Sequence, residues 1–284
     1  MHGLLSAIEP TRQAALQRAQ GAGRIAVRAE AGRTRLSRLY QDGCAKIRLP
    51  VDHAARALEA VLINTSGGLT GGDRMAWQVR ADAGAALTLT TQACEKVYRA
   101  RDGRAEVAVT LEAGIGARID WLPQETILFD RAALSRTLEA DLATGARLLA
   151  AEAVVLGRTA MGETVQSGLL RDRWRIRREG RLVFADDLRF EGPVADIAAL
   201  APTLGGGKAF ASLLLVADDA ERFLAPLREV LGPPTSNLVG GASAFDGKLF
   251  ARIVADDGQA LRRALLPALA VLRDGEPCPR VWRL

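Results

Sequence analysis

The sequence predicts a mainly β fold of many short strands, with two helices confined to the C-terminal third. Apolar and polar side chains alternate in stretches such as 85–90, 105–111 and 174–177, which is the period of a strand with one buried face. Turns that contain glycine separate these stretches roughly every ten residues. Strands this short, joined by such turns, favour neighbours that run in opposite directions, so we expect many short antiparallel strands.

Two further segments are expected to form strands. Residues 33–50 carry the same alternation and are broken at the Asp42-Gly43 turn. The composition of segment 132–157, rich in alanine and leucine, favours helix, but Thr144-Gly145 interrupts it and its flanks resemble strands. We therefore assign strands to this segment as well.

The C-terminal third changes character, because a helix follows each predicted strand. Short apolar strands are predicted at 212–216 and 249–254. An aspartate of Asp218-Asp219 can cap the first helix, and one of Asp256-Asp257 can cap the second. Pro267 lies inside the second helix, where we expect a kink or a local break.

The domain organisation is simple. We expect residues 1–23 to form a flexible N-terminal segment and residues 24–284 to form one domain, with a subdivision near 192–210 left open. Hydrophobic residues make up 49% and charged residues 25% of the chain, which is the balance of a folded protein. We see neither a signal peptide nor an apolar run of the roughly 18 residues that a membrane helix needs, so we expect a cytoplasmic protein without a membrane partner.

The cysteines and histidines are too few and too dispersed for a standard metal site. The three cysteines are Cys44, Cys94 and Cys278, and the two histidines are His2 and His53. Their number and spacing argue against a disulfide framework and against a permanent zinc site. A metal handled by this chain would meet mostly carboxylates, backbone carbonyls and water.

The net charge of +5 is spread over the chain, and its densest part is a run of arginines at 171–181. A nucleic-acid site would interleave such a run with stacking aromatic residues, and only Trp174 lies within it. We favour a strand with outward-facing arginines and keep a basic nucleic-acid-binding β protein as an alternative.

The glycine-rich segment 64–73 reads Asn-Thr-Ser-Gly-Gly-Leu-Thr-Gly-Gly-Asp. It lacks the Lys-Ser/Thr of a P-loop and the dinucleotide-binding fingerprint. The favoured interpretation is a tight loop that needs glycine conformations. The alternative is a loop whose small residues allow a partner or an ion to come near Asp73.

Cys94, in segment 90–99, has no histidine nearby in sequence to hold it as a thiolate, so we do not expect it to be a nucleophile. Glu125, paired with Asp130 or Asp186, would be needed for a carboxylate-based hydrolase, which we keep as an alternative without a complete catalytic constellation.

Further acids, among them Glu152 and Asp186, lie beside apolar runs. For any one of them the sequence favours a surface position, whereas several buried together would form an internal polar path.

Several of these segments, in this order, resemble the UreD/UreH family of urease accessory proteins. The resemblance rests on the loop 64–73, on Thr-Thr-Gln-Ala…Lys-Val-Tyr-Arg at 90–99, on Trp-Leu-Pro-Gln-Glu-Thr-Ile-Leu-Phe at 121–129, on Leu-Gly-Arg-x-x-x-Gly-Glu at 156–163 and on Pro-Arg-Val-Trp at 279–282. It spans the chain from about residue 24 onward.

The resemblance implies strands stacked in a β-helix-like or sandwich-like arrangement, and a protein that is not an enzyme. It implies a scaffold that binds UreF, the GTPase UreG and apo-urease, and that helps to deliver nickel to urease through an internal channel. The acidic positions that match the proposed route are Asp73, Glu152 and Asp186. Nickel would be in transit and not tightly bound, which suits a chain poor in histidine and cysteine ligands. Glu95 departs from the family pattern and would add a ligand if it points inward.

Overall fold

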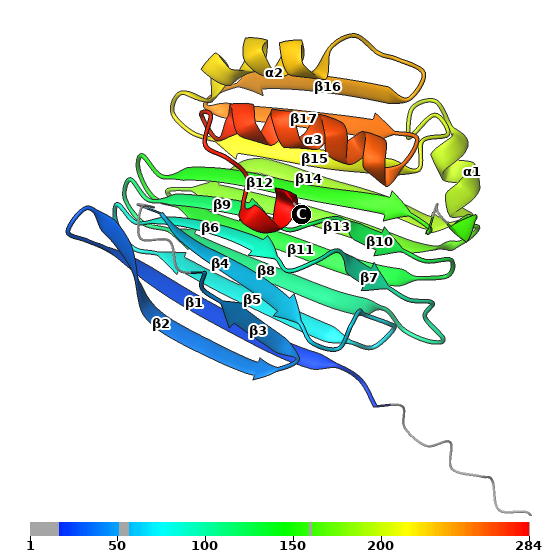
Figure 1. Cartoon of the computed structure of the whole chain (residues 1–284), viewed down its shortest axis with the longest axis horizontal. Coiled ribbons are helices and arrows are strands. Elements are labelled where there is room, and N and C mark those ends of the chain that lie inside the picture. The colour runs from blue at the N-terminus through cyan, green and yellow to red at the C-terminus, as the bar shows by residue number, and fades with distance from the viewer. Residues whose placement is uncertain (1–16, 51–56, 159–160, 284) are drawn as a thin grey trace, which may run out of the picture.

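Two β-sheets stacked on each other dominate the computed structural model, which describes residues 17–50, 57–158 and 161–283 (Figure 1). The seven-stranded sheet runs in the spatial order β14 (Arg181–Gly192), β13 (Gly168–Arg178), β11 (Ala133–Leu142), β8 (Ala105–Ala113), β5 (Arg74–Ala81), β1 (Gln20–Glu30), β2 (Arg33–Gly43). The ten-stranded sheet runs β16 (Leu238–Phe245), β17 (Lys248–Ala255), β15 (Ala209–Val216), β12 (Arg147–Leu156), β9 (Arg118–Leu122), β6 (Ala86–Thr91), β4 (Leu58–Asn64), β3 (Ala45–Arg48), with β10 (Thr126–Leu128) paired to β12 and β7 (Glu95–Val97) paired to β10. The predicted mainly β, stacked architecture is confirmed.

The predicted antiparallel pairing is wrong for the central strands. In the seven-stranded sheet β1, β5, β8, β11 and β13 pair in parallel, and in the other sheet β4, β6, β9 and β12 do the same. The reason is that turns such as those from β5 to β6 and from β8 to β9 carry the chain across to the other sheet. A period-2 pattern reports that one face of a strand is buried, but it does not report the direction of the neighbouring strand.

The turns that cross between the sheets are stacked on one another. Gly84, Gly116 and Gly145 have φ values of 68°, 62° and 67°, which glycine adopts without steric cost. The Gly84 N–H donates to the Ile115 carbonyl at 2.9 Å, and the Gly116 N–H donates to the Thr144 carbonyl at 3.0 Å. Successive turns therefore continue the backbone hydrogen bonding of the sheets, which explains the regular glycine spacing.

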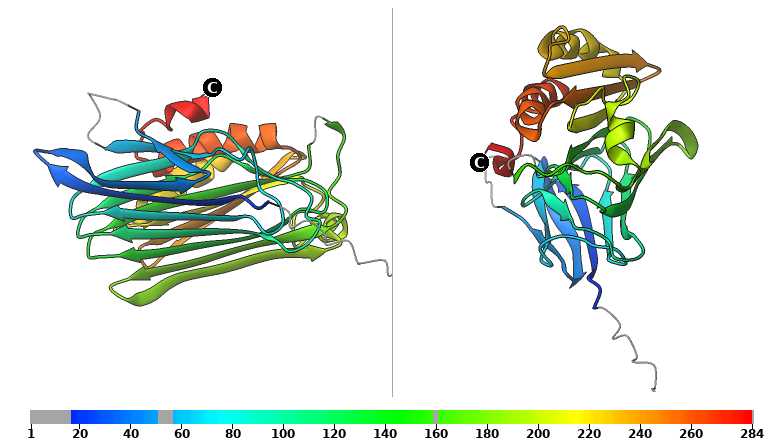
Figure 2. Two further views of the ribbon diagram at one scale, coloured as in Figure 1. Left: turned by 90° about the horizontal axis from the view of Figure 1, so that it is seen from below. Right: turned by 90° about the vertical axis from the view of Figure 1, so that its right-hand side faces the viewer.

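Both faces of the ten-stranded sheet are covered over β12, β15 and β17. One face packs against the seven-stranded sheet, and the other packs against α2 (Leu224–Leu231) and α3 (Gly258–Leu272) (Figure 2). On β12, Leu148 faces the other sheet while Leu149 faces the helices, so every residue of this strand after Arg147 is buried. A strand buried on both faces reads as a continuous apolar run, which is why its sequence is ambiguous between strand and helix.

The two predicted helices are confirmed. Asp257 caps α3, accepting a hydrogen bond from the Ala260 N–H at 2.7 Å, and Asp219 precedes the short 3-10 helix η2 (Ala220–Phe223) that leads into α2. The α3 helix continues through Pro267 and does not break there, since leucines on its buried face hold both halves against the sheet. Within the described ranges, no helix is long and apolar enough to cross a membrane.

Some elements were not predicted. The six-residue helix α1 (Val194–Ala199) falls in the segment considered for a subdivision, and it is too short to show a helical period. The glycine-rich edge strand β16 was also missed, and a terminal 3-10 turn, η3 (Arg280–Arg283), ends the described chain. The first strand starts at Gln20, before the expected domain start at residue 24.

Candidate functional site

A buried cluster of charged side chains joins the two sheets. Arg136 on β11 contacts the carboxylate of Glu152 on β12, and its guanidinium lies 2.5 Å from the carboxylate of Asp172 on β13. Trp121 Nε1 donates to Glu152 at 2.8 Å, and Trp174 Nε1 donates to Asp172 at 3.1 Å. Each carboxylate thus has a shared cation and an aromatic N–H donor, which is what allows charges to remain buried.

The charges in this cluster do not balance. Two carboxylates share one guanidinium, and Glu152 is only 2% exposed. Burial raises the pKa of Glu152 to about 7, and neighbouring Asp172 adds to the rise, while Arg136 opposes it. Arg136 Nε is buried and has no hydrogen-bond partner among the described residues. The cluster can therefore take up or release a proton near neutral pH.

Further polar residues continue the cluster across the interior. Glu152, Ser212 and Arg252 lie directly opposite one another on β12, β15 and β17, so they share the face that looks toward the other sheet. Arg252 donates at 2.6 Å to Asp186 on β14, and these two side chains are 43% and 23% exposed. We call the whole set the polar row: Arg136, Glu152, Asp172, Ser212, Asp186 and Arg252. It starts in the core and ends at the surface between β14 and β17.

The polar row divides the space between the sheets into two apolar clusters. On β12, Ala150 belongs to one cluster and Val154 to the other, with Glu152 between them. Leu138 and Leu134 flank Arg136 on β11 in the same way. The surface position that the sequence favoured for Glu152 is therefore wrong, because the side chain lies on the inter-sheet face of a fully buried strand.

Asp73 is not part of the polar row. Its two carboxylate oxygens accept backbone hydrogen bonds from Ala19 and Thr70, both at 2.8 Å, and the residue is buried. A Cβ atom on Gly71 would lie 2.0 Å from the Asp102 carbonyl, so only glycine fits there. The interpretation of segment 64–73 as a tight glycine loop is supported, and Asp73 closes that loop.

Glu95 lies beside this loop with most of its side chain covered. Its two carboxylate oxygens accept hydrogen bonds from Asn64 Nδ2 at 3.2 and 3.3 Å. Burial raises the pKa of Glu95 to about 7, and the Asn64 hydrogen bond only partly offsets this. Like Glu152, it is an acid that titrates near neutral pH.

We predict that Glu95→Gln weakens the pH dependence of stability. In the folded protein Glu95 holds its proton up to about pH 7, whereas in the unfolded chain it loses it above about 4.5. The folded state therefore binds more protons between these values, and the free energy of unfolding falls as pH rises through this window. Between pH 5 and pH 8 the free energy of unfolding of the natural chain should therefore fall by up to about 3 kcal/mol more than that of the variant.

Urea denaturation at the two pH values measures this difference. Glu191→Gln, at an exposed position on β14, is the control and should change neither value. An equal loss of stability at both pH values in Glu95→Gln would show that the side chain acts only as a hydrogen-bond acceptor.

Cys94 and Glu125 do not form a nucleophilic pair. The Cys94 thiol lies 3.4 Å from a Glu125 oxygen, and burial together with this carboxylate raises the thiol pKa to about 11. Glu125 pairs with Arg262 of α3 at 2.9 Å, while Asp130 accepts hydrogen bonds from the backbone of Gln166 and Ser167. Glu125 and Asp130 thus have separate structural partners, and the third acid considered for a hydrolase, Asp186, pairs with Arg252.

The motif at 121–129 and the C-terminal Pro-Arg-Val-Trp motif meet in space. Trp282 Nε1 donates to Thr90 Oγ1 and to the Leu122 carbonyl, both at 3.1 Å. Arg262 lies over the Trp282 ring, at 4.9 Å from its centroid, and also donates to the Trp282 carbonyl at 2.8 Å. Together with the Glu125–Arg262 pair, these contacts fix the C-terminus and α3 to the ten-stranded sheet.

The structure brings together two of the three acids chosen from the sequence. Glu152 and Asp186 belong to the polar row, whereas Asp73 holds its own loop. Sequence reasoning missed Arg136 and Asp172. The signal was available, because each is a charged residue at one of the alternate positions that the apolar pattern of its strand marks as buried. Among the described residues, no three His, Cys, Asp or Glu side chains come together in a way that could hold a metal ion. Both histidines lie outside the described residues.

Comparison with known proteins gives a consistent result. A family model described as UreD urease accessory protein matches residues 19–283. The urease accessory protein UreD of Rhizobium etli is 56% identical over 268 residues, which cover 94% of this chain and 96% of that protein. The UreD of Agrobacterium fabrum is 52% identical over 282 residues, covering 99% and 96%, and that of Sinorhizobium medicae is 51% identical over 281 residues, covering 98% and 100%. The chain therefore belongs to the UreD family of urease accessory proteins.

Proposed function

We propose that this protein is a non-catalytic scaffold of urease maturation, which binds UreF, UreG and apo-urease in the cytoplasm and passes nickel along the polar row. The family membership supports a role in maturation. The observation that carries the nickel route is the continuous line of polar side chains from the buried Glu152 to the half-exposed Asp186–Arg252 pair.

The chemistry of the polar row suits a metal ion in transit. Carboxylates bind Ni²⁺ less firmly than imidazole or thiolate, and the cluster contains neither. The guanidinium of Arg136 occupies the place of a cation between Glu152 and Asp172. Passage of Ni²⁺ would require this guanidinium to move aside, and the proton that Glu152 holds near neutral pH would be released when the metal binds.

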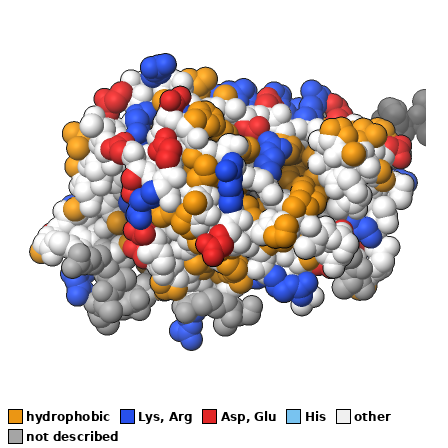
Figure 3. All heavy atoms as spheres, turned by 90° about the horizontal axis from the view of Figure 1, so that it is seen from above, with side chains coloured by type: hydrophobic (Ala, Val, Ile, Leu, Met, Phe, Trp, Pro, Cys, Tyr) orange, Lys and Arg blue, Asp and Glu red, His pale blue; other side chains and the backbone are white. Residues whose placement is uncertain are grey.

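Exposed apolar side chains lie near the surface end of the polar row. Val239 and Phe245 on β16 are 52% and 50% exposed. Val239 and Phe245 are two and four residues from Gly241, so all three lie on the same face of β16. Gly241 is opposite Arg252, and this face is therefore the one that carries the surface end of the polar row. Figure 3, which views the molecule from above Figure 1, the side on which α2 and β16 lie, shows apolar side chains among charged ones. Exposed apolar residues of this kind support a partner surface next to the exit of the row.

We predict that Glu152→Gln and Asp186→Asn reduce urease activation without preventing assembly. Each substitution keeps the size of the side chain and replaces one carboxylate of the polar row by an uncharged amide, which binds a metal ion less well. We expect activation to fall by roughly tenfold, the size of effect seen when groups that support a metal site are lost. The measurement is co-purification with UreF and UreG, followed by activation of apo-urease with nickel and GTP.

The matched control is Glu191→Gln. Glu191 lies on the same strand, β14, points to the opposite face and pairs with the exposed Arg189. It should leave both assembly and activation unchanged. Full activation by the Glu152 and Asp186 variants would exclude the polar row as the nickel route, and loss of UreF binding would indicate damage to the fold.

A further inference from the structure

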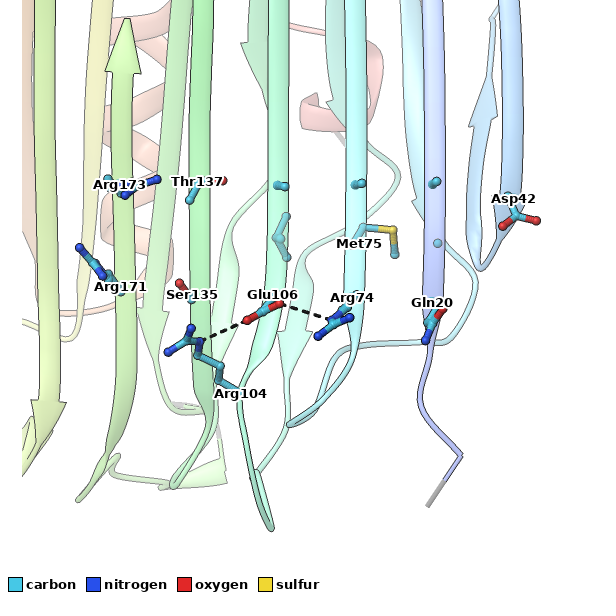
Figure 4. A pocket seen from close by; sticks show the side chains of 15 residues that line it. Gln20, Asp42, Arg74, Met75, Arg104, Glu106, Ser135, Thr137, Arg171 and Arg173 are labelled. Atoms are coloured by element: carbon cyan, nitrogen blue, oxygen red, sulfur yellow. Dashed lines mark ion pairs between the residues drawn. The ribbon is translucent and has the colours of Figure 1, made fainter. Parts of the chain in front are cut away.

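A hollow of about 550 Å³ lies on the outer face of the seven-stranded sheet (Figure 4). Its floor consists of small side chains, because Ala22, Ala76, Ala108 and Thr137 lie opposite one another on β1, β5, β8 and β11. This face is the one turned away from the polar row, so the hollow is a separate surface.

Arginines dominate the rim of the hollow. Figure 4 shows Arg171 and Arg173 on one side, on β13, Arg74 toward the other side, and Arg104 between them, below Ser135. Glu106 lies between Arg74 and Arg104, at 3.4 Å and 3.5 Å, and is the shared ion-pair partner of both. The described residues that line the hollow include four arginines but only two acids. Asp187, outside the lining, pairs with Arg171 at 2.8 Å, so the surplus of positive charge rests on Arg74, Arg104 and Arg173.

The arginines keep hydrogen-bond donors for a ligand. Arg173 has only a distant acid partner, Glu139 at 3.6 Å, and its side chain is 37% exposed. The Glu106 contacts of Arg74 and Arg104 are also long and exposed. Each guanidinium carries five N–H donors, so at Arg74, Arg104 and Arg173 an incoming carboxylate can bind without first breaking a strong ion pair. Arg171 already pairs with Asp187 at 2.8 and 3.1 Å, so a ligand would have to share this guanidinium with Asp187.

The spacing of the arginines indicates an extended ligand with several anionic groups. Arg74, Glu106, Ser135 and Arg171 lie opposite one another on successive strands. Arg74 and Arg171 are therefore three strand spacings apart, about 14 Å, which is too far for one phosphate or carboxylate. None of the described side chains that line the hollow is aromatic, so it lacks the stacking platform of a site for single-stranded nucleic acid.

We infer that the hollow binds an acidic segment of a partner polypeptide, whose carboxylates pair with the arginines on both sides. Charge complementarity and the small-residue floor, which allows a backbone to approach the sheet, favour this occupant. The inference goes beyond the proposed nickel route, and it would stand if the polar row carried no metal.

The test uses a fluorescently labelled decaglutamate peptide and the full chain. Binding is followed by fluorescence anisotropy at about 50 and 300 mM salt, which separates exposed ion pairing from other contacts. We expect the affinity for the peptide to fall as the salt concentration rises. We also expect each of the double variants Arg171→Ala/Arg173→Ala and Arg74→Ala/Arg104→Ala to lower this affinity about tenfold.

The control is Arg28→Ala/Arg222→Ala, which removes the same charge at two exposed positions away from the hollow. It should bind the peptide as the natural chain does. Equal weakening in all three double variants would overturn the inference, because the peptide would then respond only to net charge. No binding at low salt would also overturn it, as would tighter binding of a decathymidylate that depends on the same arginines.

Discussion

Replacement of Arg136 by methionine is expected to lower the free energy of unfolding by about 3–5 kcal/mol. The variant leaves Glu152 and Asp172 buried between the sheets without their shared cation. Arg136 holds down the raised pKa of Glu152, so its removal raises that pKa further and the loss should be larger at pH 8 than at pH 5. Trp121 and Trp174, two of the four tryptophans of the chain, donate hydrogen bonds into the cluster, so tryptophan fluorescence during urea denaturation follows the unfolding of the surrounding core.

Two comparisons make this expectation specific. The triple variant Arg136→Met/Glu152→Gln/Asp172→Asn removes all three charges and should recover most of the lost stability, since breaking a buried pair costs more than replacing it. Arg173→Met, at an outward position of β13, should change stability by less than about 0.5 kcal/mol. A loss below about 1 kcal/mol in Arg136→Met would mean that water reaches the cluster and that the polar row is open.

Local features of the fold could be predicted from sequence, whereas the direction of the strands could not. The stretches that alternate, the glycine turns and the aspartate at the start of α3 all correspond to elements of the structure. Parallel and antiparallel strands with one buried face have the same period, so the sequence could not show that the chain crosses between sheets at each turn. That crossing is a property of the stacked turns, such as the Gly84–Ile115 contact, which join segments far apart in sequence.

The candidate site was predicted only in part, for a related reason. Glu152 stands in a strand that is buried on both faces, so no alternation marks it as inward-facing. Its neighbours Arg136 and Asp172 come from strands of the other sheet, and only the stacking of the sheets brings them together. Asp73 was chosen because of its place in the glycine-rich motif, and the sequence could not reveal that its carboxylate already accepts hydrogen bonds from two backbone amides.

The second large effect is expected at the C-terminus, where Trp282→Ala should lower the free energy of unfolding by about 3–5 kcal/mol. The ring is 1% exposed and fills the space between α3 and the ten-stranded sheet. Its removal also leaves the Thr90 hydroxyl and the Leu122 carbonyl without their donor, and it takes away the aromatic face on which Arg262 rests. Thermal or urea denaturation of the full chain measures the loss.

Trp282→Phe separates the two contributions to this effect. Phenylalanine keeps most of the buried ring but donates no hydrogen bond, so it should cost about 1–3 kcal/mol, clearly less than alanine. If alanine and phenylalanine cost the same, the hydrogen bonds and not the packing hold the C-terminus. Because Trp282 is anchored on the face of the ten-stranded sheet opposite the polar row, the phenylalanine variant should still activate urease in proportion to its folded fraction. A loss of activation beyond that fraction would place the C-terminus in a partner interface.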